Sequence, residues 1–172
     1  YLTTLHYIRK YIGDRKSAKI LDIGCGTGVY AVPLAEDGHA VDAVDLVNYH
    51  VGILKQKKER LGLESLTVRR ADALDLRKLP EEAYDIVLCL GPLYHMFSEE
   101  DKVTVLLQAK KRMKPDGILF AGDIMNEFGV LIYGFREKNA LASLESGKLD
   151  PDFHIRNTKE DLFSFERMED IS

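Results

Sequence analysis

The sequence lacks the features that mark several large classes of protein. Its 172 residues contain no tryptophan and two cysteines, Cys25 and Cys89, which suffice for neither a disulfide framework nor a zinc site. The five histidines are scattered, and no two have the spacing of metal ligands. No apolar run approaches the roughly 20 residues that cross a bilayer, and no stretch has the pattern of a signal peptide. We therefore expect a cytoplasmic protein without a metal site and without a membrane association.

A surplus of positive charge is also missing. The 24 lysines and arginines are outnumbered by 28 aspartates and glutamates, which gives a net charge of −4. A protein that holds nucleic acid through many phosphates carries a basic surplus. The balance therefore disfavours a nucleic-acid partner and favours a small-molecule substrate, and it leaves the oligomeric state open.

What is present is the composition of an ordinary soluble domain, with 45% hydrophobic and 30% charged residues. Strand-like and helix-like segments alternate with short links. We expect strands at 18–23, 39–45, 65–70, 84–90 and 118–124, and helices at 1–12, 29–37, 48–61 and from Ser98 onward. This alternation predicts an α/β fold, a doubly wound and mainly parallel sheet with helices on both faces and right-handed crossovers.

The last part of the chain departs from this alternation. Pro115, Asp116 and Gly117 predict a turn before the strand 118–124. We expect helix over 126–147, a loop over 148–157 and a further helix start at Thr158.

The most informative stretch is Ile-Leu-Asp-Ile-Gly-Cys-Gly-Thr-Gly at 20–28. Its first four residues have the apolar character of a strand that is covered on both faces. Three glycines at alternate positions then allow positive φ angles and a close approach of the backbone to a ligand. Because a helix follows, the amides of the turn would attract electron-rich or anionic groups. The stretch therefore predicts a nucleotide-type site.

The glycine spacing narrows this choice. The dinucleotide fingerprint is G-x-G-x-x-G, whereas here the glycines stand at 24, 26 and 28 and position 29 is Val. The pattern G-x-G-x-G after a hydrophobic strand and an acidic residue resembles motif I of the class I S-adenosylmethionine-dependent methyltransferases. That resemblance implies a Rossmann-like methyltransferase fold with S-adenosyl-L-methionine as the cofactor.

Acidic residues follow the next two expected strands. Asp45 ends the strand 39–45, at the distance from Gly24 where an acidic side chain accepts hydrogen bonds from ribose hydroxyls. That role exists in nicotinamide sites and in S-adenosylmethionine sites alike. Asp72 and Ala73 follow the strand 65–70, and in the methyltransferase family an acid at this place binds the exocyclic amine of adenine while its neighbour supplies a backbone contact. Asp42 lies too early in its strand to reach the rim of the sheet.

After the strand 84–90 the chain continues as Gly91-Pro92-Leu93-Tyr94-His95. The Gly-Pro pair predicts a sharp turn that aims Tyr94 and His95 over the strand ends. An aromatic ring there could stack on a substrate or favour a sulfonium by cation–π attraction, and His95 could take a proton from a nucleophile. The turn lacks the Asp or Asn that enzymes methylating nucleobase amino groups usually carry, so it departs from that subgroup. Alternatively, Tyr94 packs as a lid and His95 caps the next helix.

The resemblance covers about residues 1–124 and is closest to a bacterial group with Gly-Pro-Leu-Tyr-His at this turn and a Thr-Thr-containing helix at the start, here Thr3 and Thr4. It implies the following cofactor-binding residues: Asp22, Gly24, Cys25, Gly26, Asp45, Leu46, Asp72, Ala73 and Leu90. It also implies that Asp22 holds the methionine end of the cofactor. Tyr94 and His95 are the candidate catalytic residues, and residues 1–124 form the cofactor-binding core while 125–172 form a helical cover of the same domain.

Two further expectations concern the sheet. The family sheet normally has two more strands than this chain offers, so we expect the protein to continue past Ser172 and to pair those strands with the edge 118–121. In the family strand order the strands 18–23 and 84–90 are neighbours, so Cys25 and Cys89 should lie close together and reduced near the cofactor.

The leading hypothesis is methyl transfer from S-adenosylmethionine to an unidentified small-molecule O, N, S or C nucleophile. One alternative is a nicotinamide-dependent oxidoreductase on the same sheet, against which the glycine spacing and Asp72 both argue. The other is a non-catalytic module that binds the cofactor and serves a partner.

Overall fold

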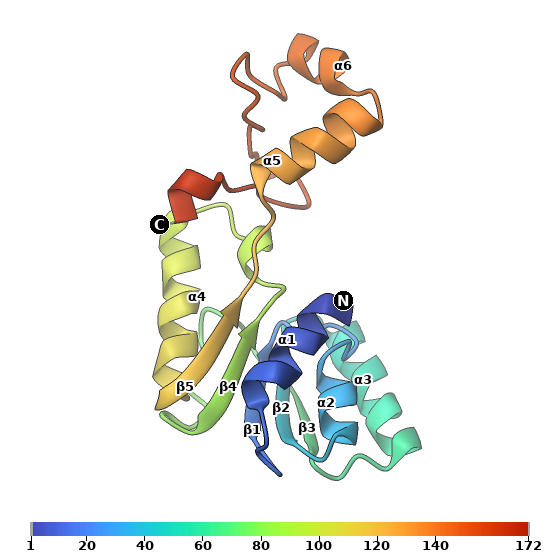
Figure 1. The fold of residues 1–172 in the computed structure, drawn as a ribbon, viewed down its shortest axis with the longest axis vertical. Coiled ribbons are helices and arrows are strands. Elements are labelled where there is room, and N and C mark those ends of the chain that lie inside the picture. Colours follow the sequence, from blue (N-terminus) through green and yellow to red (C-terminus); the bar gives the residue numbers. More distant parts are fainter. Residues whose placement is uncertain (1, 172) are drawn as a thin grey trace.

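The computed structural model describes residues 2–171 and contains one sheet of five parallel strands (Figure 1). Tyr1 and Ser172, which the sequence predictions include at the two ends, lie outside the described residues. The strands are β1 (Lys19–Ile23), β2 (Ala40–Asp45), β3 (Leu66–Arg70), β4 (Tyr84–Cys89) and β5 (Met113–Ala121). Their order in the sheet is β3-β2-β1-β4-β5, and every neighbouring pair is parallel. The predicted doubly wound α/β fold is confirmed.

Helices cover both faces of this sheet (Figure 1). The first face carries α1 (Leu2–Ile12), α2 (Ala31–Glu36) and α3 (Asn48–Leu61), and the other carries α4 (Glu99–Arg112). Successive strand residues supply the two faces in turn: Ile20 packs with the first group of helices, whereas Leu21 packs with the core beneath α4. Both layers are buried, which is why the central strands β1 and β4 are mainly apolar.

The helix ends follow the local chemistry of the sequence. Gly62 ends α3 in the left-handed conformation at φ +63°, as a C-terminal glycine does. The Ser98 hydroxyl accepts a hydrogen bond from the Asp101 amide at 3.1 Å and caps α4. That helix has acids in its first turn and bases in its last, which suits its dipole. Both predicted boundaries are confirmed.

The last strand differs from its prediction. β5 begins at Met113 and ends at Ala121, three residues before Ile124. Its pairing with β4 jumps from Tyr84↔Met113 to Ile86↔Ile118, so the predicted turn at 115–117 is present as a bulge within the strand. A Cβ at Gly117 would lie 2.4 Å from Met113 Cγ, which shows how tightly this bulge is folded.

The segment after β5 stands beyond the carboxyl ends of β4 and β5 (Figure 1). The helix predicted over 126–147 is divided into α5 (Asn126–Gly129), a π-helical stretch (Val130–Arg136) and α6 (Ala140–Glu145). The break coincides with Lys138, whose φ is +63°. The predicted loop at 148–157 is confirmed, apart from one isolated bridge between Leu149 and Ile155.

The helix predicted from Thr158 is wrong. Thr158 does form the expected start, because its amide and hydroxyl both donate to Asp161. Asp161 is also paired with Lys148, however, and the chain then runs without helix to a 3-10 turn at Met168–Ile171. We call residues 162–166 the strap, because they cross back over the turn that follows β4.

Two properties of the described residues bear on the expected partners. Within residues 2–171, no helix is both long enough and apolar enough to cross a membrane. Within the same residues, β5 pairs with β4 alone and its outer edge pairs with no strand. The expected continuation of the sheet at this edge stays a prediction.

Candidate active site at the carboxyl edge of the sheet

The glycine turn after β1 is shaped by its neighbours as well as by its own sequence. Gly24, Gly26 and Gly28 have φ angles of +70°, +53° and +88°, which disfavour other residues. A Cβ at Gly24 would lie 2.7 Å from the ring of Pro92, and one at Gly28 would lie 2.3 Å from Leu54. No atom lies within 4 Å of the corresponding position at Gly26, so the open side of the turn is at its middle glycine.

Asp22 lies under this turn and is almost completely buried, with 2% of its surface exposed. Its Oδ2 atom has no hydrogen-bond partner among the described residues. Burial, opposed by a hydrogen bond from the Ala31 amide and reinforced by the charge of Asp45, raises the pKa of Asp22 to about 7. A buried carboxylate oxygen without a partner is costly, so this atom is a strong candidate to receive a ligand cation.

Asp45 ends β2 and turns its carboxylate toward the glycine turn. Oδ2 accepts a hydrogen bond from the Gly26 amide at 2.8 Å, and Oδ1 accepts one from the Val47 amide at 2.9 Å. The ring nitrogen Nδ1 of His50 lies 3.3 Å from Oδ1. Oδ2, with the Gly26 amide as its one partner among the described residues, keeps a second lone pair and can still accept a ligand hydroxyl. Leu46, the next residue, is half exposed beside it.

Asp72 and Ala73 lie beyond the end of β3. The two strand ends are joined, because the Ala71 amide donates to the Asp45 carbonyl oxygen at 3.1 Å. Asp72 Oδ1 accepts a hydrogen bond from the Leu74 amide at 3.0 Å, and both Asp72 and Ala73 are partly exposed. The Asp72 carboxylate therefore takes part in its own turn and still reaches solvent at the rim.

The turn after β4 lies against the glycine turn. A Cβ at Gly91 would lie 3.0 Å from the Gly24 carbonyl oxygen and 3.8 Å from the Tyr94 hydroxyl. Leu90 packs partly buried against the core. Leu93, Tyr94 and His95 form one turn of 3-10 helix. Burial, with Tyr30 and Asp123 nearby, raises the pKa of Tyr94, so its hydroxyl remains a hydrogen-bond donor.

His95 is exposed and contacts the strap. Its Nδ1 atom lies 3.0 Å from the Leu162 carbonyl oxygen, and its ring lies 5.4 Å from the ring of Phe163. A carbonyl oxygen only accepts hydrogen bonds, so Nδ1 carries the proton in this arrangement and Nε2 of the neutral ring is a base. His95 does not cap α4, because Ser98 does.

Cys25 follows the end of β1 and Cys89 ends β4, and these two strands are neighbours, as predicted. β1 pairs directly with β4, and Ile23 is in register with Cys89. Both thiols are free and buried. Burial, with Asp22 and Asp45 nearby, raises the pKa of Cys25, and burial with Asp22 and Asp123 raises that of Cys89 to about 12. Both are therefore protonated and behave as small apolar groups.

Sequence reasoning missed three contributors to this edge. Lys57 of α3 donates from Nζ to the Thr27 carbonyl oxygen of the glycine turn at 2.7 Å. His50 was one of the scattered histidines. The strap contacts the β4 turn through the Ser164 amide, which donates to the Tyr94 carbonyl oxygen at 2.7 Å. No motif indicated these contacts, although the position of His50, five residues after Asp45, could have suggested one.

Comparison with known proteins identifies the family to which the chain belongs. Residues 20–117, more than half of the chain, match the methyltransferase domain family. The ubiquinone biosynthesis O-methyltransferase of Haemophilus ducreyi is 30% identical over 123 residues, which make up 69% of this chain and 50% of the relative. The YcgJ protein of Bacillus subtilis has a similar structure, with a TM-score of 0.65 and 22% identity over 93% of this chain and 64% of that one.

A coclaurine N-methyltransferase bound to N-methylheliamine and SAH is also similar in structure, with a TM-score of 0.59 and 23% identity over 70% of this chain and 34% of that one. The chain therefore belongs to the methyltransferase domain family. The predicted resemblance to class I methyltransferases is confirmed, with S-adenosylmethionine as the cofactor of the class. The chain spans about half the length of the curated relatives it matches, so the reaction of the whole protein is a proposal.

The residues at this edge fit that cofactor. Asp22 Oδ2 offers an unpaired buried carboxylate oxygen to an ammonium group. Gly26 leaves open space in the middle of the turn where a ligand can approach the backbone. Asp45 presents carboxylate oxygens beside that opening, as a ribose requires.

Proposed function

We propose that the protein transfers a methyl group from S-adenosylmethionine to a small-molecule nucleophile. The observation that carries the proposal is Asp22, whose buried oxygen without a partner lies under a glycine turn of the methyltransferase family. The printed name of the Haemophilus relative, an O-methyltransferase, makes a hydroxyl oxygen the first acceptor class to test. N, S and C nucleophiles remain in the proposal.

Each cofactor-binding residue has a distinct part in this proposal. Asp22 pairs with the ammonium of the methionine end, and Gly24, Cys25 and Gly26 provide the backbone that lies against the ligand. Asp45 accepts the ribose hydroxyls, with Leu46 beside it. Asp72 accepts the amine of adenine, Ala73 supplies a backbone contact, and Leu90 forms part of the floor.

In this proposal the catalytic residues, Tyr94 and His95, lie in the β4 turn. When bound, S-adenosylmethionine supplies a methyl group on a cationic sulfur that is already activated for attack. Tyr94 presents an aromatic ring and a protonated hydroxyl toward the glycine turn, which suits a cation. His95, with Nδ1 held by the strap, has Nε2 available to take the proton of an O–H or N–H nucleophile. Much of the acceleration would come from positioning the acceptor in line with the methyl group.

Two rival functions are separable by binding and by activity. Calorimetric titration with S-adenosylhomocysteine and, separately, with NADH distinguishes the methyltransferase from a nicotinamide-dependent oxidoreductase. We expect saturable binding of S-adenosylhomocysteine alone, and binding of NADH alone would refute the proposal.

A radiolabelled methyl-transfer screen, led by hydroxyl-bearing acceptors, distinguishes an enzyme from a non-catalytic binding module. The His95→Gln variant is its control, because general-base catalysis contributes about 100-fold or more to the rate. Turnover that is unchanged in this variant would remove His95 from the mechanism.

A further inference from the structure

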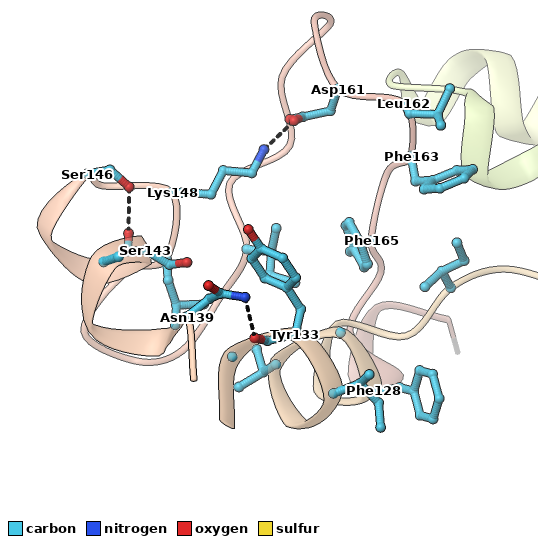
Figure 2. Close-up of a pocket in the computed structure, with 18 residues that line it drawn as sticks. Phe128, Tyr133, Asn139, Ser143, Ser146, Lys148, Asp161, Leu162, Phe163 and Phe165 are labelled. Atoms are coloured by element: carbon cyan, nitrogen blue, oxygen red, sulfur yellow. Dashed lines mark hydrogen bonds and ion pairs between the residues drawn. The ribbon is translucent and has the colours of Figure 1, made fainter. Parts of the chain in front are cut away.

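The segment beyond β5 forms an open cavity of about 910 Å³ that the residues of the proposed cofactor site do not line. Pockets of about 300–1,000 Å³ are typical for small-molecule ligands. Figure 2 shows its lining, which comes from α5, the π-helical stretch, α6 and the strap. Phe128, Tyr133, Phe163 and Phe165 supply aromatic rings, and half of the other lining residues are aliphatic. The shape and chemistry suit a ring-containing molecule.

Charge in the lining is balanced. Among the residues that line the described cavity, Lys148 and Asp161 are the charged ones, and they form an ion pair with each other. The polar groups of Asn139 and Ser146 are directed to backbone oxygens of Tyr133 and Ser143. A charged ligand would therefore lose its hydration without gaining a free counter-charge. An uncharged ligand avoids that cost.

The two ends of the cavity differ (Figure 2). Asn139, Ser143, Ser146 and Lys148 lie toward one side, and Phe128, Phe163 and Phe165 lie toward the other. Phe163 contacts both the cavity and the β4 turn. It lines the cavity, and its ring contacts the ring of Tyr94 edge-on at 5.6 Å and that of His95 at 5.4 Å. The aromatic end of the cavity is thus the end next to the proposed catalytic turn.

We infer that this cavity binds the methyl acceptor, and that the acceptor is an uncharged, mainly apolar molecule with a ring, whose reacting group lies at the Phe163 end. The inference rests on the proposed function. In this arrangement Phe163 separates the acceptor from the β4 turn. The strap, which carries Phe163, therefore has to shift before the acceptor can meet Tyr94 and His95.

Calorimetry with two probes of equal size tests the charge selectivity. We expect wild-type protein to bind 2-naphthol at least tenfold more tightly than 2-naphthoate at pH 8. Ser143→Phe places a ring in the cavity and should weaken 2-naphthol binding at least tenfold. Leu141→Phe, on the same helix but exposed and outside the lining, should leave it unchanged. Ser146→Phe, at an exposed lining position, is a second blocking variant should Ser143→Phe fold poorly.

Equal affinity for the two naphthalenes would overturn the inference. So would unchanged 2-naphthol binding in a folded Ser143→Phe or Ser146→Phe variant. S-adenosylhomocysteine is titrated into each protein separately. Selective 2-naphthol binding without S-adenosylhomocysteine binding would support the cavity and refute the proposed function, and the reverse pattern would refute the cavity alone.

Discussion

The sheet domain and the segment after β5 are held together in different ways. In the sheet domain the strands β1 to β4 all have buried residues, and side chains such as Ile20, Leu88 and Tyr84 have no exposed surface. After β5, the described segment buries few apolar side chains, Val130 and Leu149 among them, and α6 buries none. Phe128, Leu131 and Phe135 are more than half exposed there.

This difference in packing suits the sheet domain and the segment after β5 to different tasks. The glycine turn, Asp22 and Asp45 are fixed by a close-packed core, which suits the binding of one particular ligand. The cavity is formed by short helices and a strap that a few hydrogen bonds hold in place, and such regions open at low cost. Five experiments test this division, and the largest effect is expected first.

Asp22→Asn should remove a pH dependence from the stability of the sheet domain. The native state keeps the Asp22 proton up to about pH 7, whereas the unfolded chain releases it near 3.8. Between these values the native state binds more protons, so the wild-type free energy of unfolding falls as pH rises, by up to about 4 kcal/mol from this group. Urea unfolding of both proteins at pH 4, 5.5 and 8 measures the difference.

The same titration should govern ligand binding. A protonated Asp22 cannot pair with an ammonium group, so the affinity of the wild-type protein for S-adenosylhomocysteine should fall as pH drops below about 7. Asp22→Asn should bind weakly at every pH. An affinity in the variant that equals the wild-type value at pH 8 would remove Asp22 from the site.

Truncation of a core side chain should distinguish the two regions directly. Leu88→Ala, in the centre of β4, should lower the free energy of unfolding by about 3 kcal/mol, within the 2–5 kcal/mol typical of buried leucines. Leu141→Ala, at a position 75% exposed on α6, should change it by less than about 0.5 kcal/mol. Chemical denaturation of the two variants provides the test, and similar losses would contradict the division drawn above.

Asp45→Ala should weaken S-adenosylhomocysteine binding by roughly 2–3 kcal/mol, since hydrogen bonds to a charged group are the stronger kind. Part of the loss would come from the Gly26 amide, which loses its acceptor. Asp42→Asn is the matched control, because Asp42 lies on the same strand but accepts from the Tyr84 hydroxyl and from Arg69. Calorimetry should show a normal dissociation constant for the control.

Lys102→Met should have the smallest effect on global stability, about 1 kcal/mol, but a local effect on the strap. Lys102 donates to Asp123 at 2.8 Å and to Glu166 at 2.6 Å, so it ties the strap to the end of β5. Hydrogen exchange at the amides of Ser164 and Glu166 should become ~10-fold faster. Exchange within β1 should not change, and a uniform acceleration would show that the strap is not an independent unit.

The sheet was predictable from the sequence because local signals and global packing agree there. The mainly apolar central strands β1 and β4, Gly62 at the end of α3 and Ser98 before α4 each specify one structure. The strand order followed from the family resemblance, and the pairing of Ile23 with Cys89 confirms it. The bulge at 114–117 was not predictable in position, since the same Pro-Asp-Gly sequence serves a free turn or a bulge.

The rest of the site depends on contacts between distant segments. Thr158 and Asp161 carry a valid helix-start signal, yet the ion pair with Lys148 and the contact of the strap with Tyr94 prevail. The link of Lys57 to the glycine turn likewise spans 30 residues. Such tertiary partners leave no periodic pattern, so the sequence indicated the glycine turn and the strand-end acids but not the contacts of Lys57 and of the strap.

The contact between Gly24 and Pro92 has a consequence for how domains of this kind are recognised. A Cβ at position 24 would collide with the ring of Pro92 in the β4 turn, and a Cβ at position 28 would push against the end of the Leu54 side chain. Together with the positive φ angles at both positions, this packing favours two of the three glycines of the motif without any contact to a ligand. A related protein that had lost methyl transfer would still carry most of the glycine motif. Evidence that such a domain still binds its ligand should therefore be sought at Asp22 and Gly26.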